Sequence, residues 1–198
     1  MLSGPVSLVL PEFTEAPKIS RINNDIRFSP NKPPYKEHMW ISFGGGHGCS
    51  SADIFAGFDR NGWTTGCGIG SMKREPLDDW RRSLIDNIGI WRKYAAAIGL
   101  GTEVMTYIEQ PYKKPLFPDV PEDIQEIVQA KAIWIIDRSR ESFEDEPEVD
   151  TYIGICKFLP LYHFMNSTGN ELKKNLSCLA DYANPPSDEV ERIWKMLG

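Results

Sequence analysis

The chain has 198 residues, of which 41% are hydrophobic and 25% charged, the composition of an ordinary globular protein large enough to bury a core. Its net charge of −6 argues against a nucleic-acid-binding role driven by overall charge. The four cysteines are scattered without a C-x-x-C pair, which is typical of reduced thiols rather than of a disulfide framework.

The N-terminal segment argues against targeting to a membrane. Its apolar stretch lacks a basic leader region and is interrupted at Pro11, so we expect neither a signal peptide nor a spanning helix. We therefore predict a cytoplasmic protein without a membrane partner. Pro5, Pro11 and Pro17 exclude a long helix in residues 1–20, which we expect to form an extended arm. Residues 1–198 are expected to form a single domain.

The highest density of charged and conformationally restricted residues lies between residues 24 and 38. Residues 18–38 contain five basic and two acidic side chains, a local reversal of sign in an acidic chain. An arginine fork at Arg27 and the point charge of Lys36 suit a carboxylate or a phosphate. The alternative is an internal network in which these two bases pair with Asp25 and Asp53.

Two strands and a hairpin are predicted next. The segment 38–43 alternates, with Met39, Ile41 and Phe43 on one face and His38, Trp40 and Ser42 on the other. The dipeptide Asn61-Gly62 is a strong hairpin signal, because a type I′ turn needs positive φ at both central residues. Folding the chain about this dipeptide pairs Arg60 with Trp63 and Phe55 with Gly68.

One face of this hairpin is nearly bare, because Gly66, Gly68 and Gly70 alternate along its second strand. Glycine in a strand costs about 0.5–1 kcal/mol relative to alanine, so a stripe of three needs a reason. Two reasons are open. A helix, the backbone or Phe55 packs tightly over the stripe, or the stripe is a floor for a flat or anionic ligand.

The remainder of the chain is mainly helical in pattern. Apolar residues recur at spacings of three and four, which predicts a long helix over residues 76–98. Strands are expected at 102–109 and 131–137, a short helix lies between them, and helices make up the C-terminal third. Together these elements predict an α+β fold with a mainly antiparallel sheet packed by the long helix.

The spacing Asp25-x-Arg27-Phe28-Ser29-x-x-Lys32-x-Pro34-Tyr35-Lys36 closely resembles the signature of a widespread bacterial and fungal family of uncharacterised proteins, a domain of unknown function. The glycine strand and the helix after Pro76 are similar to later elements of that family, and the resemblance covers most of residues 21–170. Asn31 stands where the family signature has an acid. The chain begins inside the family pattern, as a divergent or truncated member would. The resemblance implies an α+β fold and supplies no activity.

Three functional hypotheses follow if His38 and Trp40 share the face of the glycines. The first is a binding module that holds an anionic small molecule or a protein partner. Its ligand contacts would be Arg27, Lys32, Tyr35, Lys36, Trp40, Gly66, Gly68 and Gly70. The second is an enzyme in which His38 or Asp53 acts as general base on a phosphorylated or carboxylated substrate. The third is that the motif is purely structural.

Cofactor and metal chemistry have little support in the sequence. The three histidines, His38, His47 and His163, show no metal-ligand spacing. The glycine-rich loop at 44–51 lacks the Lys-Ser/Thr ending of a phosphate loop. We therefore predict neither a cofactor nor a metal, and the oligomeric state is left open.

Overall fold

The computed structural model describes residues 13, 16–27, 31, 33–43, 51–60, 62–70, 73–140, 147–177, 179 and 187–197. Six strands form one antiparallel sheet in the order β1-β2-β3-β4-β6-β5. The strands are β1 (Lys18–Ile19), β2 (His38–Phe43), β3 (Asp53–Asp59), β4 (Gly62–Ile69), β5 (Val104–Glu109) and β6 (Ala132–Arg140). The predicted α+β class with an antiparallel sheet is confirmed.

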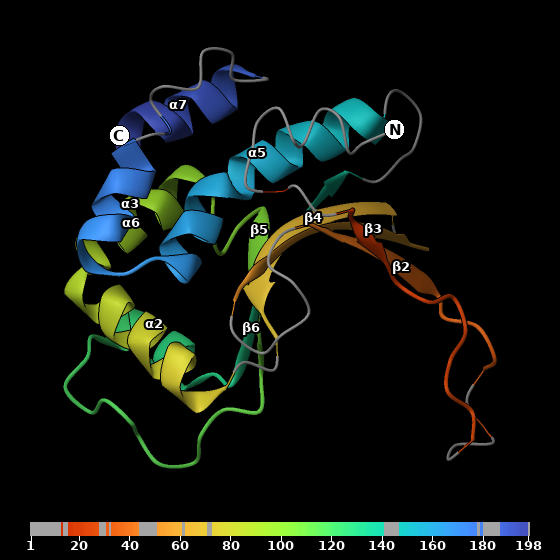
Figure 1. The fold of residues 1–198 in the computed structure, drawn as a ribbon, viewed down its shortest axis with the longest axis horizontal. Coiled ribbons are helices and arrows are strands. Elements are labelled where there is room, and N and C mark those ends of the chain that lie inside the picture. Colours follow the sequence, from red (N-terminus) through yellow and green to blue (C-terminus); the bar gives the residue numbers. More distant parts are fainter. Residues whose placement is uncertain are drawn as a thin grey trace.

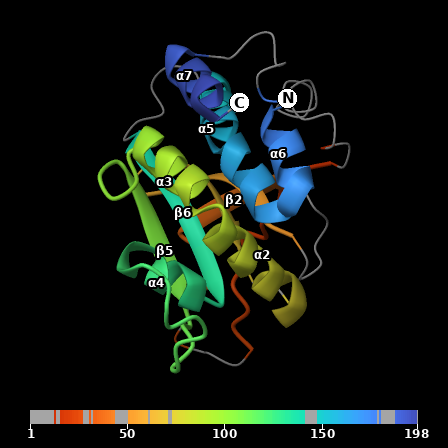
Figure 2. The ribbon, with the colours of Figure 1, turned by 90° about the vertical axis from the view of Figure 1, so that its left-hand side faces the viewer.

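The helices gather on one face of this curved sheet (Figures 1 and 2). They are α2 (Arg74–Asp86), α3 (Ile88–Ala97), α4 (Glu122–Gln129), α5 (Pro147–Asn166), α6 (Gly169–Ser177) and α7 (Asp188–Leu197). In the part of the chain that is described, no helix covers the opposite face, which we call the open face. No described helix combines the length and apolarity needed to cross a bilayer.

The core lies between the sheet and the helices. Successive residues of a strand point to opposite faces, so alternate positions of β3, β4 and β6 meet the helices. These positions are aliphatic or small and at most 1% exposed: Ile54, Ala56, Cys67, Ile69, Ile133 and Ile135. Burial of each isoleucine contributes about 1.5–3 kcal/mol. In β2 the predicted alternation is confirmed, because Phe43 is buried and Ile41 packs against the same core.

The hairpin between β3 and β4 forms in a different register from the predicted one. Asp59 pairs with Gly62 and Phe55 with Gly66, so the predicted pairing is wrong by two residues. Because the shift is even, every side chain keeps its predicted face. Gly62 has φ of 125°, a conformation that favours glycine, and it already belongs to the second strand. Positions 60 and 61 therefore connect the strands; Asn61 lies outside the described residues.

The predicted long helix over residues 76–98 is two helices, α2 and α3, which meet at Asn87. This residue has φ of −119° and ψ of 30°, outside the helical region. Its side-chain amide donates to the Ser83 carbonyl at 2.9 Å and its backbone N–H donates to the same oxygen at 3.0 Å. Asparagine side chains compete in this way with the helical hydrogen-bond ladder, which explains the break. The predicted apolar stripe is nevertheless buried or packed against the core.

The C-terminal third is helical, as predicted. Pro160 lies inside α5, which runs on to Asn166 rather than ending there. The Ser187 hydroxyl accepts a hydrogen bond from the Val190 N–H at 3.3 Å at the start of α7. Of the predicted N-terminal arm over residues 1–20, most lies outside the described residues, and Lys18–Ile19 forms the edge strand β1.

Candidate functional site

A row of aromatic side chains crosses the open face of the sheet. Trp40 of β2, Phe55 of β3 and Trp134 of β6 form this aromatic row. The ring centroids of Trp40 and Phe55 are 5.2 Å apart with an interplanar angle of 85°. Those of Phe55 and Trp134 are 5.6 Å apart at 77°. Both pairs have the edge-to-face arrangement that aromatic quadrupoles favour.

The aromatic row lies over the glycines, which explains the glycine stripe. In the stripe, a Cβ atom added to Gly66 would come within 2.6 Å of a Phe55 ring atom, and one added to Gly68 would come within the same distance of Trp134. Gly57 of β3 is in the same position beneath the ring of Trp40. Side chains larger than hydrogen do not fit there. The packing explanation of the stripe is therefore what the structure shows, although Gly68 is covered by Trp134 and not by Phe55. A ligand above this face would meet the rings first.

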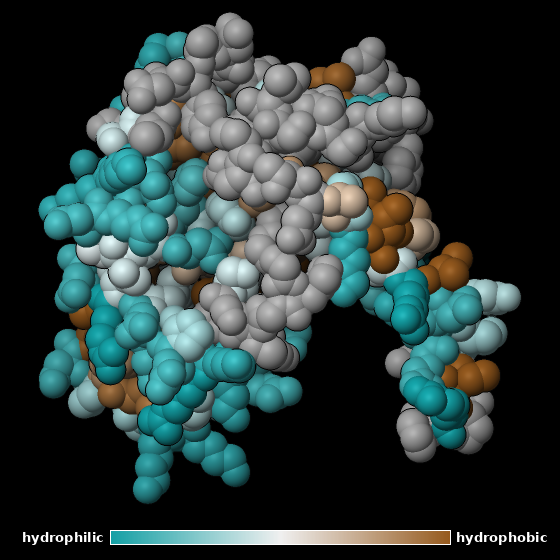
Figure 3. Space-filling model, viewed as in Figure 1, coloured by the Kyte–Doolittle hydropathy of each residue, from teal (hydrophilic) through white to brown (hydrophobic). Residues whose placement is uncertain are grey.

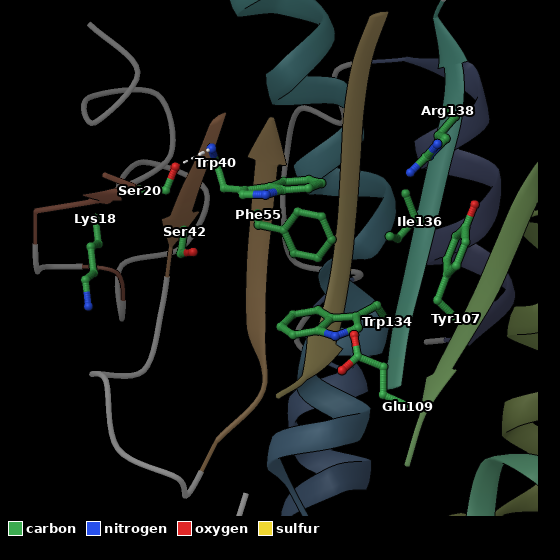
Figure 4. Close-up of a pocket in the computed structure, with 10 residues that line it drawn as sticks. All are labelled: Lys18, Ser20, Trp40, Ser42, Phe55, Tyr107, Glu109, Trp134, Ile136 and Arg138. Atoms are coloured by element: carbon green, nitrogen blue, oxygen red, sulfur yellow. Dashed lines mark hydrogen bonds between the residues drawn. The ribbon is translucent and has the colours of Figure 1, made fainter. Parts of the chain in front are cut away.

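A cavity of 520 Å³ opens above the aromatic row (Figure 4). Its volume falls within the usual range of small-molecule sites, about 300–1,000 Å³. The lining residues come from five of the six strands and from the segment after β1: Lys18, Ser20, Trp40, Ser42, Phe55, Tyr107, Glu109, Trp134, Ile136 and Arg138. Half of these ten residues are aromatic or apolar, two are serines and three are charged.

The charged side chains of the cavity occupy different sides of it. Arg138 lies next to Tyr107, with its guanidinium carbon 5.5 Å from the ring centroid. Among the described residues no carboxylate lies within ion-pair distance of Arg138. Lys18 is on the β1 side, and Glu109 extends toward Trp134 (Figure 4). An exposed guanidinium beside aromatic rings is suited to a carboxylate or a phosphate.

The structure brings together part of the predicted site. Trp40 pairs with Gly57 across β2 and β3, so the prediction that His38 and Trp40 share the face of the glycines is confirmed. The ring of His38 is 5.6 Å from that of Trp40, and His38 itself is exposed. Asp53 pairs with Gly68 on the same face. Neither His38 nor Asp53 lines the cavity.

Lys18 is the one basic residue of the stretch 18–38 that lines this cavity among the described residues. The described part of residues 22–36, which we call the arm, belongs to a hairpin that projects from the body (Figures 1 and 3). It is held by an isolated bridge between Asn23 and Tyr35 and by the Lys36 N–H, which donates to the Ile22 carbonyl at 2.8 Å. Figure 3 shows a hollow between the arm and the body.

Within the arm, Arg27 pairs with its neighbour Asp25. The Arg27 Nη2 and the Asp25 Oδ2 are 2.6 Å apart, and this pairing raises the pKa of Arg27. One part of the internal network considered from the sequence is thereby present. Arg27, Tyr35 and Lys36 are not among the residues that line the cavity, and Lys32 lies outside the described residues.

Sequence reasoning missed most of the cavity lining. Phe55, Tyr107, Trp134 and Arg138 were not considered as site residues. For Trp134 and Arg138 the signal was the alternation along residues 132–138, which places both on one face of β6 with Ile136. Alternation alone could not reveal this site, because it does not say which face the helices cover.

A second polar cluster lies on the helix face, with Lys157 and Asp137 buried and Glu189 exposed. Lys157 of α5 is 5% exposed, and its Nζ lies 2.9 Å from Asp137 Oδ2 and 3.0 Å from Glu189 Oε1. Burial lowers the pKa of Lys157, but the two carboxylates outweigh it, and the net pKa is raised. The adjoining cavity measures only 90 Å³. No described group of histidine, cysteine and acidic residues is arranged to hold a metal. The cluster joins α5, β6 and α7 through these two ion pairs.

Fold and cavity together define the class: an α+β protein with helices on one face of a curved antiparallel sheet and an aromatic cavity on the other. A family model described as conserved hypothetical protein (DUF2461) matches residues 5–163. The chain belongs to this family, which confirms the family membership that the sequence resemblance indicated; the motif at residues 25–36 stays a prediction. No curated protein and no solved structure matched the chain.

Proposed function

We propose that the protein binds a small organic anion in the cavity on the open face of its sheet. The observation that carries this proposal is the aromatic row with Arg138 and Lys18 at the edges of the same cavity. Aromatic walls with a few convergent polar groups are the usual composition of a small-molecule site. The rings supply apolar contact area, and the cations supply charge complementarity.

In this proposal the positive charge comes from Arg138 and Lys18. The sequence had predicted this role for Arg27, Lys32 and Lys36. Trp40 keeps its predicted role as a ligand contact. The glycines act indirectly, because they create the space in which the rings lie. The charged group of the ligand would bind to Arg138, whose guanidinium is exposed at the cavity edge. Hydrogen bonds to charged groups contribute about 1.5–3 kcal/mol each.

A protein partner for the arm is the second candidate, and the exposure of its apolar side chains favours it. Ile22, Ile26 and Tyr35 are 51%, 47% and 62% exposed on a projecting hairpin. Exposed apolar side chains that a partner can cover are a feature of interaction surfaces. The enzymatic hypothesis, with His38 or Asp53 as general base, stays a prediction that a turnover assay on phosphorylated and carboxylated substrates would test.

The experiment is a titration by calorimetry with organic carboxylates and phosphates, selected first by thermal shift. Arg138→Gln should weaken binding of the best anion by about 10- to 100-fold. The matched control is Arg192→Gln, which removes the same charge from an exposed position on α7. Equal affinities for the two variants, or no binding of any anion at millimolar concentration, would contradict the proposed function.

A further inference from the structure

The two indoles of the aromatic row stand on either side of Phe55. In Figure 4 the Trp40 indole is seen edge-on and the Phe55 ring face-on, with Trp134 on its other side. Each indole plane is close to perpendicular to the Phe55 ring, at 85° and 77°. Because Figure 4 shows the two indoles on opposite sides of this ring, we describe them as walls and Phe55, which is 5% exposed, as the floor between them. We call this part of the cavity the indole slot.

The walls of the indole slot are held in place before any ligand binds. Trp40 lies against Gly57, and its backbone N–H donates to the Ser20 hydroxyl at 2.9 Å. Trp134 lies over Gly68 and reaches Gly70, where an added Cβ would be 3.3 Å from its Cζ2 atom. Side chains locked by such contacts lose little freedom on binding, so a ligand that fits pays a small entropic cost.

We infer that the indole slot takes a flat aromatic ring stacked between Trp40 and Trp134, with the anionic group of the same ligand on Arg138. This inference rests on the proposed function and names the ligand class. A flat ring presents a π face to each indole, whereas a puckered saturated ring of equal size touches two flat walls at only a few atoms. The cavity of 520 Å³ has room for a bicyclic ring with its substituent.

The charges at the cavity edges orient such a ligand. Glu109 extends toward Trp134, so a carboxylate or phosphate at that end of the slot would be repelled. Arg138 attracts the same group on the other side of Tyr107. The ligand therefore carries its negative charge at the end that lies near Arg138 and not at the end that lies near Glu109.

The test varies planarity and charge separately, with calorimetry on the full chain. The probes are 2-naphthoate, its saturated counterpart decahydro-2-naphthoate, and the neutral planar alcohol 2-naphthalenemethanol. We expect 2-naphthoate to bind about 5- to 100-fold more tightly than either of the others. Its ring protons should also shift upfield in NMR spectra, because they lie between two indole faces.

The outcomes separate the two proposals. Equal binding of 2-naphthoate and its saturated counterpart would overturn the indole slot and leave the proposed anion-binding function standing. Equal binding of 2-naphthoate and the neutral alcohol would overturn the anion-binding function and leave the slot standing. No binding of any of the three probes at millimolar concentration would overturn both.

Variants of the walls provide the second measurement. Trp40→Leu and Trp134→Leu should each weaken 2-naphthoate by at least about fivefold and change decahydro-2-naphthoate by less than about twofold. The control is Met105→Leu, an exposed residue of β5 outside the cavity lining. Unchanged thermal unfolding of either tryptophan variant shows that the fold survives. A folded wall variant that loses affinity for both probes equally would contradict stacking.

Discussion

The same strands form both faces of the sheet, but their side chains pack differently on each face. On the helix face, β3 and β4 present Ile54, Ala56, Cys67 and Ile69, all at 0% exposure beneath a second layer. On the open face the same strands present Phe55 and a series of glycines, with no helix above them in the described chain. There the large rings lie sideways on the glycines of the neighbouring strands, so packing occurs within one layer.

This difference separates stability from binding. A side chain on the helix face is surrounded, so its loss leaves a cavity or an unpaired charge inside the protein. A ring on the open face keeps one side toward the cavity, so its loss should affect a ligand more than the fold. The difference also explains how a sheet can present a rigid aromatic surface without a second layer. Each glycine leaves space above its Cα atom, and the ring of a neighbouring strand fills that space.

The largest effect is expected from the buried charge cluster on the helix face. Lys157→Met removes the ion pair to Asp137, which is 7% exposed, and should lower the free energy of unfolding by about 3–5 kcal/mol. Urea unfolding measures this change. Adding Asp137→Leu should recover most of the loss, because no buried charge is then left alone. The affinity of the folded protein for 2-naphthoate should stay within about twofold; a larger change would show that the two faces are not independent.

Alkaline pH should also act through the helix face. Burial raises the pKa of the Cys156 thiol to about 12. The folded state then keeps a proton that the unfolded thiol loses above pH of about 9, so stability falls as pH rises from about 9 to 12. The expected slope from this one group is about 1.4 kcal/mol per pH unit, read from urea unfolding at several pH values. Cys156→Ala should reduce the slope, and an identical slope in this variant would contradict the assignment.

On the open face, the glycines under the rings should be sensitive to a single methyl group. Gly68→Ala places a Cβ 2.4 Å from Trp134 Cε3 and 2.5 Å from the Ile133 carbonyl oxygen, and should destabilise the protein by about 1–3 kcal/mol. Gly89→Ala is the matched control. No neighbouring atom lies within 4 Å of its added Cβ, and this exposed helical position should gain about 0.5–1 kcal/mol. Equal effects of the two changes would contradict the packing of rings on glycine.

The smallest effect is expected from the arm, which belongs to neither face. The Arg27 side chain is 77% exposed, and its ion pair with Asp25 lies within a local stretch of three residues. Arg27→Ala should therefore leave the melting temperature unchanged within error. The hypothesis of a purely structural motif predicts unfolding instead, so a drop of many degrees in differential scanning calorimetry would restore it. Unchanged 2-naphthoate affinity would place the arm outside the small-molecule site.

Local pattern accounts for much of the fold. Spacings of three and four located α2 and α3, although they could not reveal the break at Asn87, which depends on one side-chain hydrogen bond to Ser83. Alternation assigned the faces of β2, β3 and β4 correctly, even where the hairpin register was wrong by two residues. The register is harder to predict, because a shift of two residues preserves every face and changes only which pairs meet.

The candidate site was predicted only in part. Alternation placed Trp40 and His38 on one face of their strand, and the hypothesis that this face is the face of the glycines is confirmed. Trp134 was read only as part of an apolar strand, because nothing near it in the sequence marks it as the cover of Gly68. The basic residues of the arm were predicted as ligand contacts because of their local density. Charge density in the sequence does not determine the direction in which a hairpin projects. The structure places Arg27 and Lys36 outside the cavity lining and Arg138 within it.

The sequence by itself determined the α+β class, the faces of the strands and the apolar stripes of the helices, because these depend on side-chain periodicity within one element. Only the tertiary structure decided which face of the sheet the helices cover and which strand lies beside β4. The pairing of β4 with β6 joins residues more than sixty positions apart and brings Trp134 over Gly68. Such long-range pairing is selected by the packing of the whole chain, so the indole slot exists only once the sheet has assembled.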